Sequence, residues 1–302
     1  MKFLSRIVTK ELGLLFACPA ILWQIFFLYM PLVILLCYSV FDYSEIDLAY
    51  HFTLERYTII FNSLYFKVIA NSFFTAIVTA FICFLIAYPV AYFLALKASK
   101  RYRTFLLISI ILPSWTSLIV QIYAWFFMLE RNGFFCQLLY TLGILPQSVH
   151  LLNNYFAILV GMVSCFLPFM ILPIYAVLER MDKSIIEASA DLGANRFETF
   201  KRVIWPLSLP GVYAGVLLVT IPAFGEFAIP TLLGGAKNVF WGNLIVDKFL
   251  RSRDWASGAA LANIGILFPA FVIIFFYIIT RIREIIKNND ARQKAGISKE
   301  PW

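Results

Sequence analysis

The 302-residue sequence predicts an all-α integral membrane protein with about six transmembrane helices and a cytoplasmic helix-turn-helix loop. The composition is 62% hydrophobic and only 14% charged, and the mean hydropathy is +0.83. Several apolar runs reach the roughly 18 residues that are needed to cross a hydrocarbon core. Most basic residues lie between these runs. This pattern excludes a soluble enzyme, a disulfide-bonded secreted scaffold and a disordered chain.

Hydropathy divides the chain into a tail at 1–11, a membrane domain at 12–280 and a second tail at 281–302. A backbone that crosses lipid must satisfy its own hydrogen bonds, so each apolar run is expected to be a helix. The first run is about twice as long as the apolar part of a signal peptide, and we interpret it as an uncleaved span. The expected spans are 12–41, 68–96, 104–129, 155–178, 207–233 and 259–280.

The basic residues predict the orientation of these spans. Eighteen of the 25 Lys and Arg residues fall in the two tails and in the loops 97–103 and 179–202, and seven fall elsewhere. Because cytoplasmic loops carry an excess of Lys and Arg, both termini are expected in the cytoplasm. The net charge of +8 therefore reflects membrane orientation, and we expect no nucleic-acid partner.

The loop at 182–206 is longer than a connection between two spans requires. Ser184 and Glu187 form a capping-box pattern at the start of a short helix. Gly193 stands where a residue in the left-handed conformation would end that helix. The pattern predicts a helix followed by a turn.

A second short helix is expected after the turn. Asn195 and Glu198 can cap it, and Pro206 is expected to end or kink it before the next span. Apolar residues recur in it at helical spacing, namely Phe197, Phe200, Val203 and Ile204. This stripe favours docking on a partner; the alternative is packing against the chain's own bundle or the membrane surface.

The run Glu187-Ala188-Ser189, with Gly193 and Pro206 after it, resembles the EAA loop of bacterial ABC importer permeases. That family pattern is E-A-A-x-x-x-G, nine residues, then I-x-L-P; here Ser189, Val203 and Trp205 depart from it. The resemblance implies that residues 182–206, called the coupling loop below, sit in a cleft of an ATPase subunit. The residues implied to make this contact are Glu187, Ala188, Ser189, Asp191, Leu192, Gly193, Phe197 and Pro206.

Other motifs, between about residues 70 and 280, are similar to those of the spermidine/putrescine permeases, and most similar to the putrescine type. They are Leu112–Ser117, Tyr123–Trp125, Leu167–Tyr175, Gly225–Pro230, Leu233–Gly235 and Arg253–Trp255. The resemblance implies the type I ABC importer permease fold, in the bacterial inner membrane. It implies half of a polyamine pathway, completed by a second permease, two ATPase subunits and a periplasmic or lipid-anchored binding protein.

Glu226 is the only charged residue deep in an expected span. A carboxylate in lipid is costly, so it should face the bundle interior, a partner subunit or a water-filled path. Pro222, Gly225 and Pro230 can break the helix around it, and broken helices often line substrate sites. Such a place suits an ammonium group; the alternative is that Glu226 pairs with a basic or polar residue of a neighbouring helix.

Aromatic and acidic residues give further candidates for the solute path. Trp115, Tyr123 and Trp125 cluster at the third span and could bind an ammonium group by cation–π contact. The alternative is interfacial packing. Asp254 and Trp255 could meet a solute or a docking protein, or could form a helix cap and an interfacial anchor.

Motifs of catalysis are absent from the sequence. There is no G-x-x-x-x-G-K-[ST] phosphate loop, no H-E-x-x-H and no Ser/His/Asp constellation, and His51 and His150 form no metal site. We therefore expect no catalytic residue, metal or cofactor in this chain. Two alternatives stay open: a permease for ferric ion, sulfate or an opine, and a secondary transporter without an ATPase. A sulfate path should show basic residues inside a span.

Overall fold

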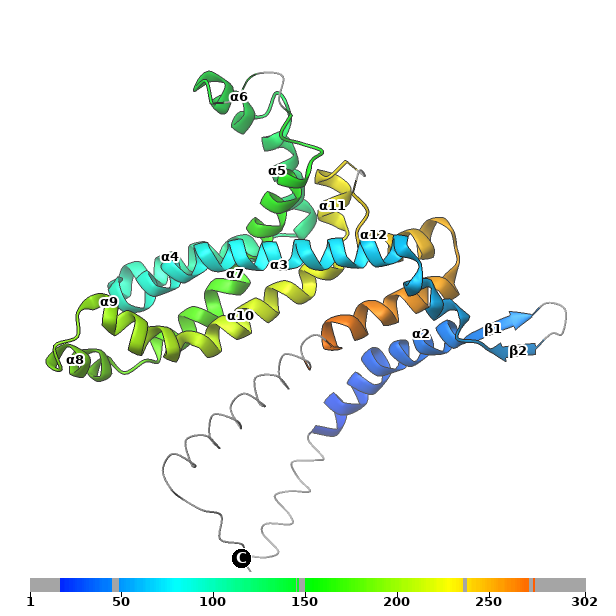
Figure 1. Cartoon of the computed structure of the whole chain (residues 1–302), viewed down its shortest axis with the longest axis horizontal. Helices are drawn as coiled ribbons and strands as arrows, with labels where there is room; N and C mark the ends of the chain where they lie inside the picture. The colour runs from blue at the N-terminus through cyan, green and yellow to red at the C-terminus, as the bar shows by residue number, and fades with distance from the viewer. Residues whose placement is uncertain are drawn as a thin grey trace, which may run out of the picture. The chain divides into compact units, whose positions relative to one another are not determined.

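The computed structural model describes residues 17–44, 49–144, 146, 150–235, 238–271 and 274, which are mostly helical (Figure 1). The expected tails at 1–11 and 281–302 lie outside the described residues. In chain order the elements are a helix Ala17–Val40 that contains α2 (Met30–Val40), β1 (Phe41–Ser44), β2 (Ala49–Phe52), α3 (Ser63–Tyr92), α4 (Lys100–Ile111), α5 (Leu118–Leu129), α6 (Phe134–Thr141), α7 (Tyr155–Glu179), α8 (Lys183–Asp191), α9 (Arg196–Thr199), α10 (Trp205–Gly225), α11 (Ala228–Leu233), α12 (Trp241–Val246) and a last helix Trp255–Phe271.

The chain divides into two compact units. The first joins residues 1–59 to 247–302. In it β1 and β2 form an antiparallel hairpin with Phe41 opposite Phe52. A buried hydrogen-bond network ties the first helix to the last: the amide of Asn263 donates to Ser39 Oγ at 3.0 Å, and Ser39 Oγ lies 2.7 Å from the hydroxyl of Tyr57.

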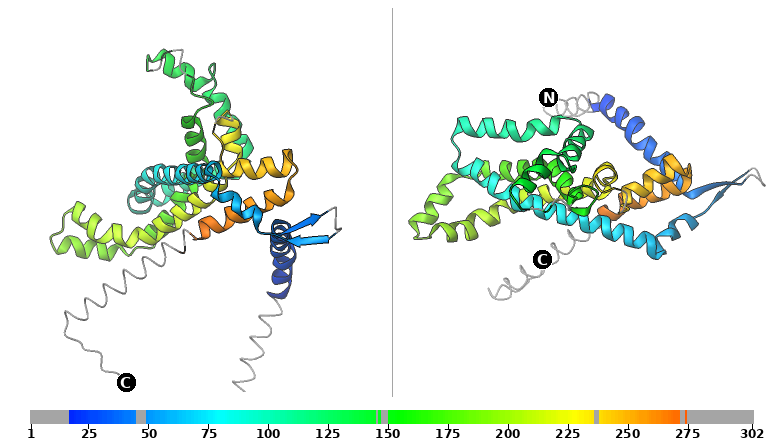
Figure 2. Two further views of the ribbon diagram at one scale, coloured as in Figure 1. Left: turned by 45° about the vertical axis from the view of Figure 1, so that its right-hand side comes forward. Right: turned by 90° about the horizontal axis from the view of Figure 1, so that it is seen from above.

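The second unit spans residues 60–246, and α3, α7 and α10 pack together in it (Figure 2). Small residues lie at their contacts: Ala76, Ala80 and Ala87 of α3 are buried. A Cβ added to Gly211 of α10 would stand 2.8 Å from the Pro173 carbonyl of α7. Small residues let helix backbones approach closely where no hydrophobic effect drives their association.

Four described helices are long and apolar enough to cross a membrane. They are Ala17–Val40, Ser63–Lys97, Tyr155–Glu179 and Arg196–Gly225, and they cover most of four of the expected spans. The helix Trp255–Phe271 begins near the expected span 259–280, the end of which lies largely outside the described residues.

The third expected span, 104–129, is not one straight helix. The structure has two helical segments, Lys100–Trp115 and Leu118–Thr141, bent by 96°. Pro113 has no N–H to continue the ladder. Its carbonyl oxygen accepts the Thr116 hydroxyl at 2.6 Å and also the Gln121 side-chain amide. The Thr116 N–H also donates to this carbonyl, at 3.1 Å, so backbone and side-chain donors together satisfy it at the bend.

The fifth expected span, 207–233, is also corrected. The helix begins earlier, at Arg196, and ends at Gly225, after which α11 is a separate helix. Pro206 does not end the helix as expected. A π-helical segment, Phe200–Ile204, precedes it, and the N–H of Trp205 donates to the Phe200 carbonyl. This wider turn shifts the hydrogen-bond register just before the proline, so the helix runs on through it.

Candidate functional site

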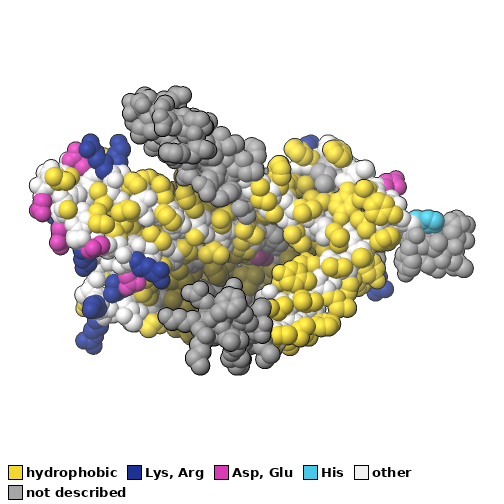
Figure 3. Space-filling model, turned by 90° about the horizontal axis from the view of Figure 1, so that it is seen from below, with side chains coloured by type: hydrophobic (Ala, Val, Ile, Leu, Met, Phe, Trp, Pro, Cys, Tyr) yellow, Lys and Arg dark blue, Asp and Glu magenta, His cyan; other side chains and the backbone are white. Residues whose placement is uncertain are grey.

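The coupling loop forms one end of the second unit, where α8 and α9 project beyond α7 and α10 (Figure 2). Charged side chains gather at this end, and hydrophobic side chains cover much of the surface next to it (Figure 3).

The first helix of the loop, α8, is capped by Asp182 and not by Ser184. The Asp182 carboxylate accepts the Ser184 N–H at 2.9 Å. This hydrogen bond holds the pKa of Asp182 below its ordinary value. The expected Ser184–Glu187 capping box is therefore wrong, because the strong capping residue lies two positions earlier and bonds the N–H of Ser184 itself.

Gly193 ends α8 in the left-handed conformation, with φ +81°, which confirms the expected turn. A Cβ at this position would meet no atom within 4 Å. The glycine is therefore needed for its backbone conformation and not for space. The N–H groups of Gly193 and Ala194 close the turn on the carbonyls of Ala190 and Ser189.

The second helix begins with the expected capping box. The Glu198 N–H donates to Asn195 Oδ1 at 2.9 Å, and the Asn195 N–H donates to Glu198 Oε2 at 3.0 Å. The two helices are also linked by side chains, because the hydroxyls of Ser189 and Thr199 lie 2.9 Å apart. Ser189, which departs from the family pattern, thus fixes α8 to α9.

The outer side of the coupling loop is solvent-exposed. Glu187, Ala188, Asp191 and Gly193 are exposed. Two large apolar side chains stand out among them, with Leu192 89% and Phe197 70% exposed. Phe197 also lines a groove of about 430 Å³ together with residues of α3, of the π-helical segment Phe200–Ile204 and of α10.

Glu226 lies at the break between α10 and α11 and not deep in a helix. Its Oε1 accepts the N–H groups of Ala228 and Ile229 at 2.8 and 3.3 Å. The carboxylate thus caps the first turn of α11. Among the described residues, no Lys or Arg forms an ion pair with it.

The aromatic candidates of the third span are not gathered in one place by ring contacts. Trp115 is 85% exposed and lies at the bend before α5. Tyr123 packs its ring against Phe126 and Phe127, with centroids 6.4 Å away in each case. Trp125 is half-buried. The two phenylalanines were not predicted, since nothing distinguishes them among 31 in the sequence.

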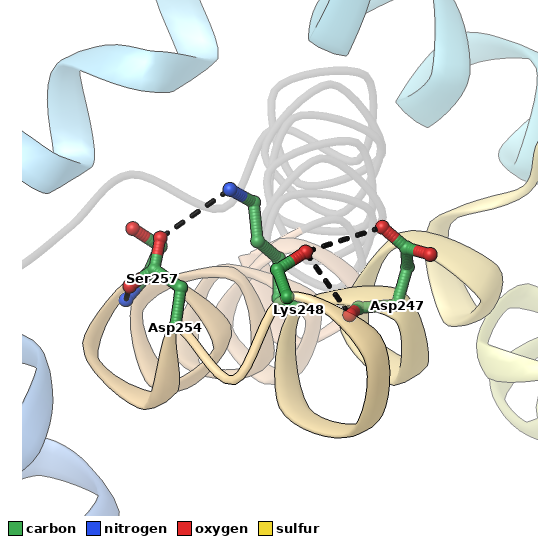
Figure 4. A network of polar contacts seen from close by, with 5 residues as sticks. Asp247, Lys248, Asp254 and Ser257 are labelled. Carbon is green, nitrogen blue, oxygen red and sulfur yellow. Dashed lines mark hydrogen bonds and ion pairs between the residues drawn. The ribbon is translucent and has the colours of Figure 1, made fainter.

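Asp254 and Trp255 lie in the first unit, at the start of the helix Trp255–Phe271, and Figure 4 shows Asp254 there with Lys248 and Ser257. Asp254 accepts the Ser257 N–H at 3.1 Å and pairs with Lys248 at 3.3 Å. Burial acts to raise its pKa, but the contacts with Ser257 and Lys248 outweigh burial and hold the pKa below its ordinary value. Trp255 packs edge-on against Phe249. This geometry is that of a helix cap, and a contact with solute stays a prediction.

Among the described residues, no group of three His, Cys, Asp or Glu side chains is placed to hold a metal ion. Two of the candidate sites lie in the second unit and are built around helix ends: the coupling loop and the break at Glu226.

Residues 87–284 match the family model of the binding-protein-dependent transport system inner membrane component. Among curated proteins, the chain is 41% identical over 256 residues to the spermidine/putrescine transport system permease protein PotB of Haemophilus influenzae, covering 84% of this chain and 89% of the relative. It is 35% identical over 263 residues to PotB of Escherichia coli, covering 86% and 94%.

The fold agrees with these matches. A crystal structure of a bacterial ABC transporter involved in alginate import matches with a TM-score of 0.70 at 16% identity, covering 93% of this chain and 99% of that chain. The comparisons and the apolar helices agree on one family: the chain belongs to the binding-protein-dependent transport system inner membrane components, as a multi-pass permease subunit of an ABC transporter.

Proposed function

We propose that this permease carries polyamines such as putrescine and spermidine, as half of the pathway of an importer. The observation that carries the proposal is its 41% and 35% identity to PotB proteins over more than four fifths of the chain. The carboxylate at the helix break adds a chemical reason. Glu226 is held by backbone N–H groups through one oxygen, which leaves the other for an ammonium group.

The complete importer would contain a second permease, two ATPase subunits and a periplasmic or lipid-anchored binding protein. In this scheme, ATP closes the ATPase dimer and the coupling loop transmits the movement to the spans. The exposed Leu192 and Phe197 supply an apolar contact, and the caps of α8 and α9 keep the loop rigid. Both termini lie in the cytoplasm, as the excess of basic residues on that side favours.

The solute path would pass Glu226. A desolvated ammonium group is attracted by a carboxylate and by aromatic faces, so Trp115, Tyr123, Trp125 and Trp255 are its further candidates, with Asp254 at the start of the last helix. Sulfate is less suited, because a sulfate path should show basic residues inside a span and this one holds the Glu226 carboxylate.

The test is to purify the importer with its ATPase and compare two matched substitutions in proteoliposomes. Phe197→Ala removes a 70% exposed ring from the coupling loop, and Phe134→Ala removes a 73% exposed ring from α6. We expect Phe197→Ala to lower ATP-driven putrescine uptake at least fivefold and to weaken co-purification of the ATPase, with Phe134→Ala close to wild type. Uptake that needs no ATPase, or equal effects of both substitutions, would contradict the coupling role.

A further inference from the structure

The beginning of α12 lies against the break between α10 and α11. Gly242 is buried there, and a Cβ added to it would stand 2.4 Å from the carbonyl oxygen of Gly225 and 3.1 Å from that of Glu226. Side chains do not tolerate such a distance to backbone, so this approach of α12 requires glycine.

A second contact fixes α12 from its other side. The Trp241 N–H donates to Ser72 Oγ of α3 at 2.8 Å, and the Trp241 side chain is fully buried. Ser72 and Trp241 are 169 positions apart in the sequence. The start of α12 is therefore held between α3 and the carbonyl groups at the break.

Asn243 contacts the same turn of α11 that Glu226 caps. Its side-chain amide donates to the Phe227 carbonyl at 3.1 Å and to Thr231 Oγ1 at 2.7 Å. Glu226 accepts the N–H groups of this turn, and Asn243 donates to its carbonyl side. The position of the Glu226 carboxylate thus depends on the first turn of α11, and Asn243 holds this turn.

Two buried polar atoms at this place have no hydrogen-bond partner among the described residues. They are Oδ1 of Asn243 and Nε1 of Trp241. Buried polar atoms in protein structures almost always have a hydrogen-bond partner. Asn243 Oδ1 is an unpaired acceptor on the residue that holds the turn beside Glu226, so a hydrogen-bond donor from outside this chain would complete the network.

We infer that Asn243 is a positioning residue for Glu226, and that the break and the start of α12 form one site for a primary ammonium group of the solute. Asn243 holds the first turn of α11, and this turn holds Glu226 Oε1, so that Oε2 stays turned to the solute. The inference rests on the proposed function for the identity of the solute, but the positioning contact can be tested without any solute.

The first measurement is hydrogen exchange in the assembled importer, comparing Asn243→Leu with Asn62→Leu. Asn62 is a matched control, because its side chain also holds the first turn of a helix, accepting the Leu64 N–H at 3.1 Å, but at the start of α3. We expect exchange at the Ala228 and Ile229 amides to be at least tenfold faster in Asn243→Leu and unchanged in Asn62→Leu. Unchanged exchange in Asn243→Leu overturns the inference, whatever the transport result.

The second measurement is a double-mutant cycle on putrescine uptake per ATP hydrolysed. Asn243→Leu should lower this ratio at least fivefold, and the double variant with Glu226→Gln should be no worse than Glu226→Gln alone, because one residue acts through the other. Losses that multiply would overturn the positioning role. If the wild-type importer takes up no putrescine, the proposed function fails, while the exchange result still decides whether Asn243 positions the break.

Discussion

The coupling loop and the break at Glu226 both interrupt long helices of the second unit, but they are built in opposite ways. In the loop, the caps and the turn come from residues close together in the sequence, between Asp182 and Thr199. At the break, Ser72 of α3 accepts the Trp241 N–H of α12, and Asn243 of α12 donates to the Phe227 carbonyl beside Glu226, so the contacts join segments that are far apart in the chain. The loop is a self-contained element, and the break is assembled by tertiary packing.

The two regions also differ in how completely their polar groups are hydrogen-bonded. The Asn195–Glu198 box pairs its donors and acceptors reciprocally. At the break, buried atoms of Trp241 and Asn243 have no partner among the described residues. A fully paired element suits the transmission of force, whereas an incompletely paired one suits the binding of a passing group.

The largest expected effect comes from removing the charge at the break. Glu226→Gln keeps an oxygen that can accept the Ala228 and Ile229 N–H groups, so we expect the free energy of unfolding to change by less than about 1 kcal/mol. Putrescine uptake in proteoliposomes should fall at least tenfold, since the ammonium group loses its counter-charge.

Glu226→Ala is the companion variant, because it removes both the charge and the cap. It should lose uptake to the same extent and also about 0.5–2 kcal/mol of stability, measured by thermal unfolding of the purified complex. Normal uptake by Glu226→Gln at equal membrane abundance would remove this carboxylate from the path and leave the break as a purely structural feature.

Two glycines at the break give a test with a smaller expected effect, which is measured on stability alone. Gly242→Ala puts a Cβ against the Gly225 carbonyl, whereas a Cβ at Gly225 itself would meet nothing within 4 Å. We expect Gly242→Ala to lower stability by about 1–3 kcal/mol and Gly225→Ala to have no such cost. Equal melting temperatures for the two variants would mean that α12 does not approach the break this closely.

The coupling loop shows what the sequence could predict. The left-handed Gly193 and the Asn195–Glu198 box follow from short-range patterns, and both are present in the structure. The expectation of Ser184 as cap was wrong because the choice lay between two nearby capping residues. Pro206 was expected to end or kink the helix, and it does not end it, because a π-helical turn that no local pattern announces precedes it.

The break shows what the sequence could not predict. Pro222, Gly225 and Pro230 indicated a disturbed helix, but not that α10 would end at Gly225. Ser72 of α3 accepts the Trp241 N–H, and Asn243 of α12 donates to the Phe227 carbonyl. Neither residue lies in a sequence motif that marks it. Contacts between distant segments depend on how helices pack, and helix packing is set by the whole core and not by local spacing.

The smallest expected effect is a pH dependence confined to the coupling loop. The Ser184 N–H stabilises the charged form of Asp182, so its pKa in the folded loop lies below the ordinary value of 3.8. The contribution of this cap to α8 is therefore fully present above that ordinary value and is lost as the pH falls through the folded pKa. Because Asp182 is fully exposed, only the first turn of α8 should respond.

Asp182→Asn separates titration from capping, because Asn caps helices about as well as Asp but carries no charge. Hydrogen exchange at the Ser184 amide, measured on the full chain, should become faster in wild type than in Asp182→Asn once the pH drops below the folded pKa. The two proteins should match near neutral pH. Amides of α11 should show no difference between these two proteins at any pH, since Asp182 does not contribute to the break. A difference at α11 would mean that the coupling loop and the break respond as one unit, and the contrast between a self-contained loop and a tertiary break would no longer hold.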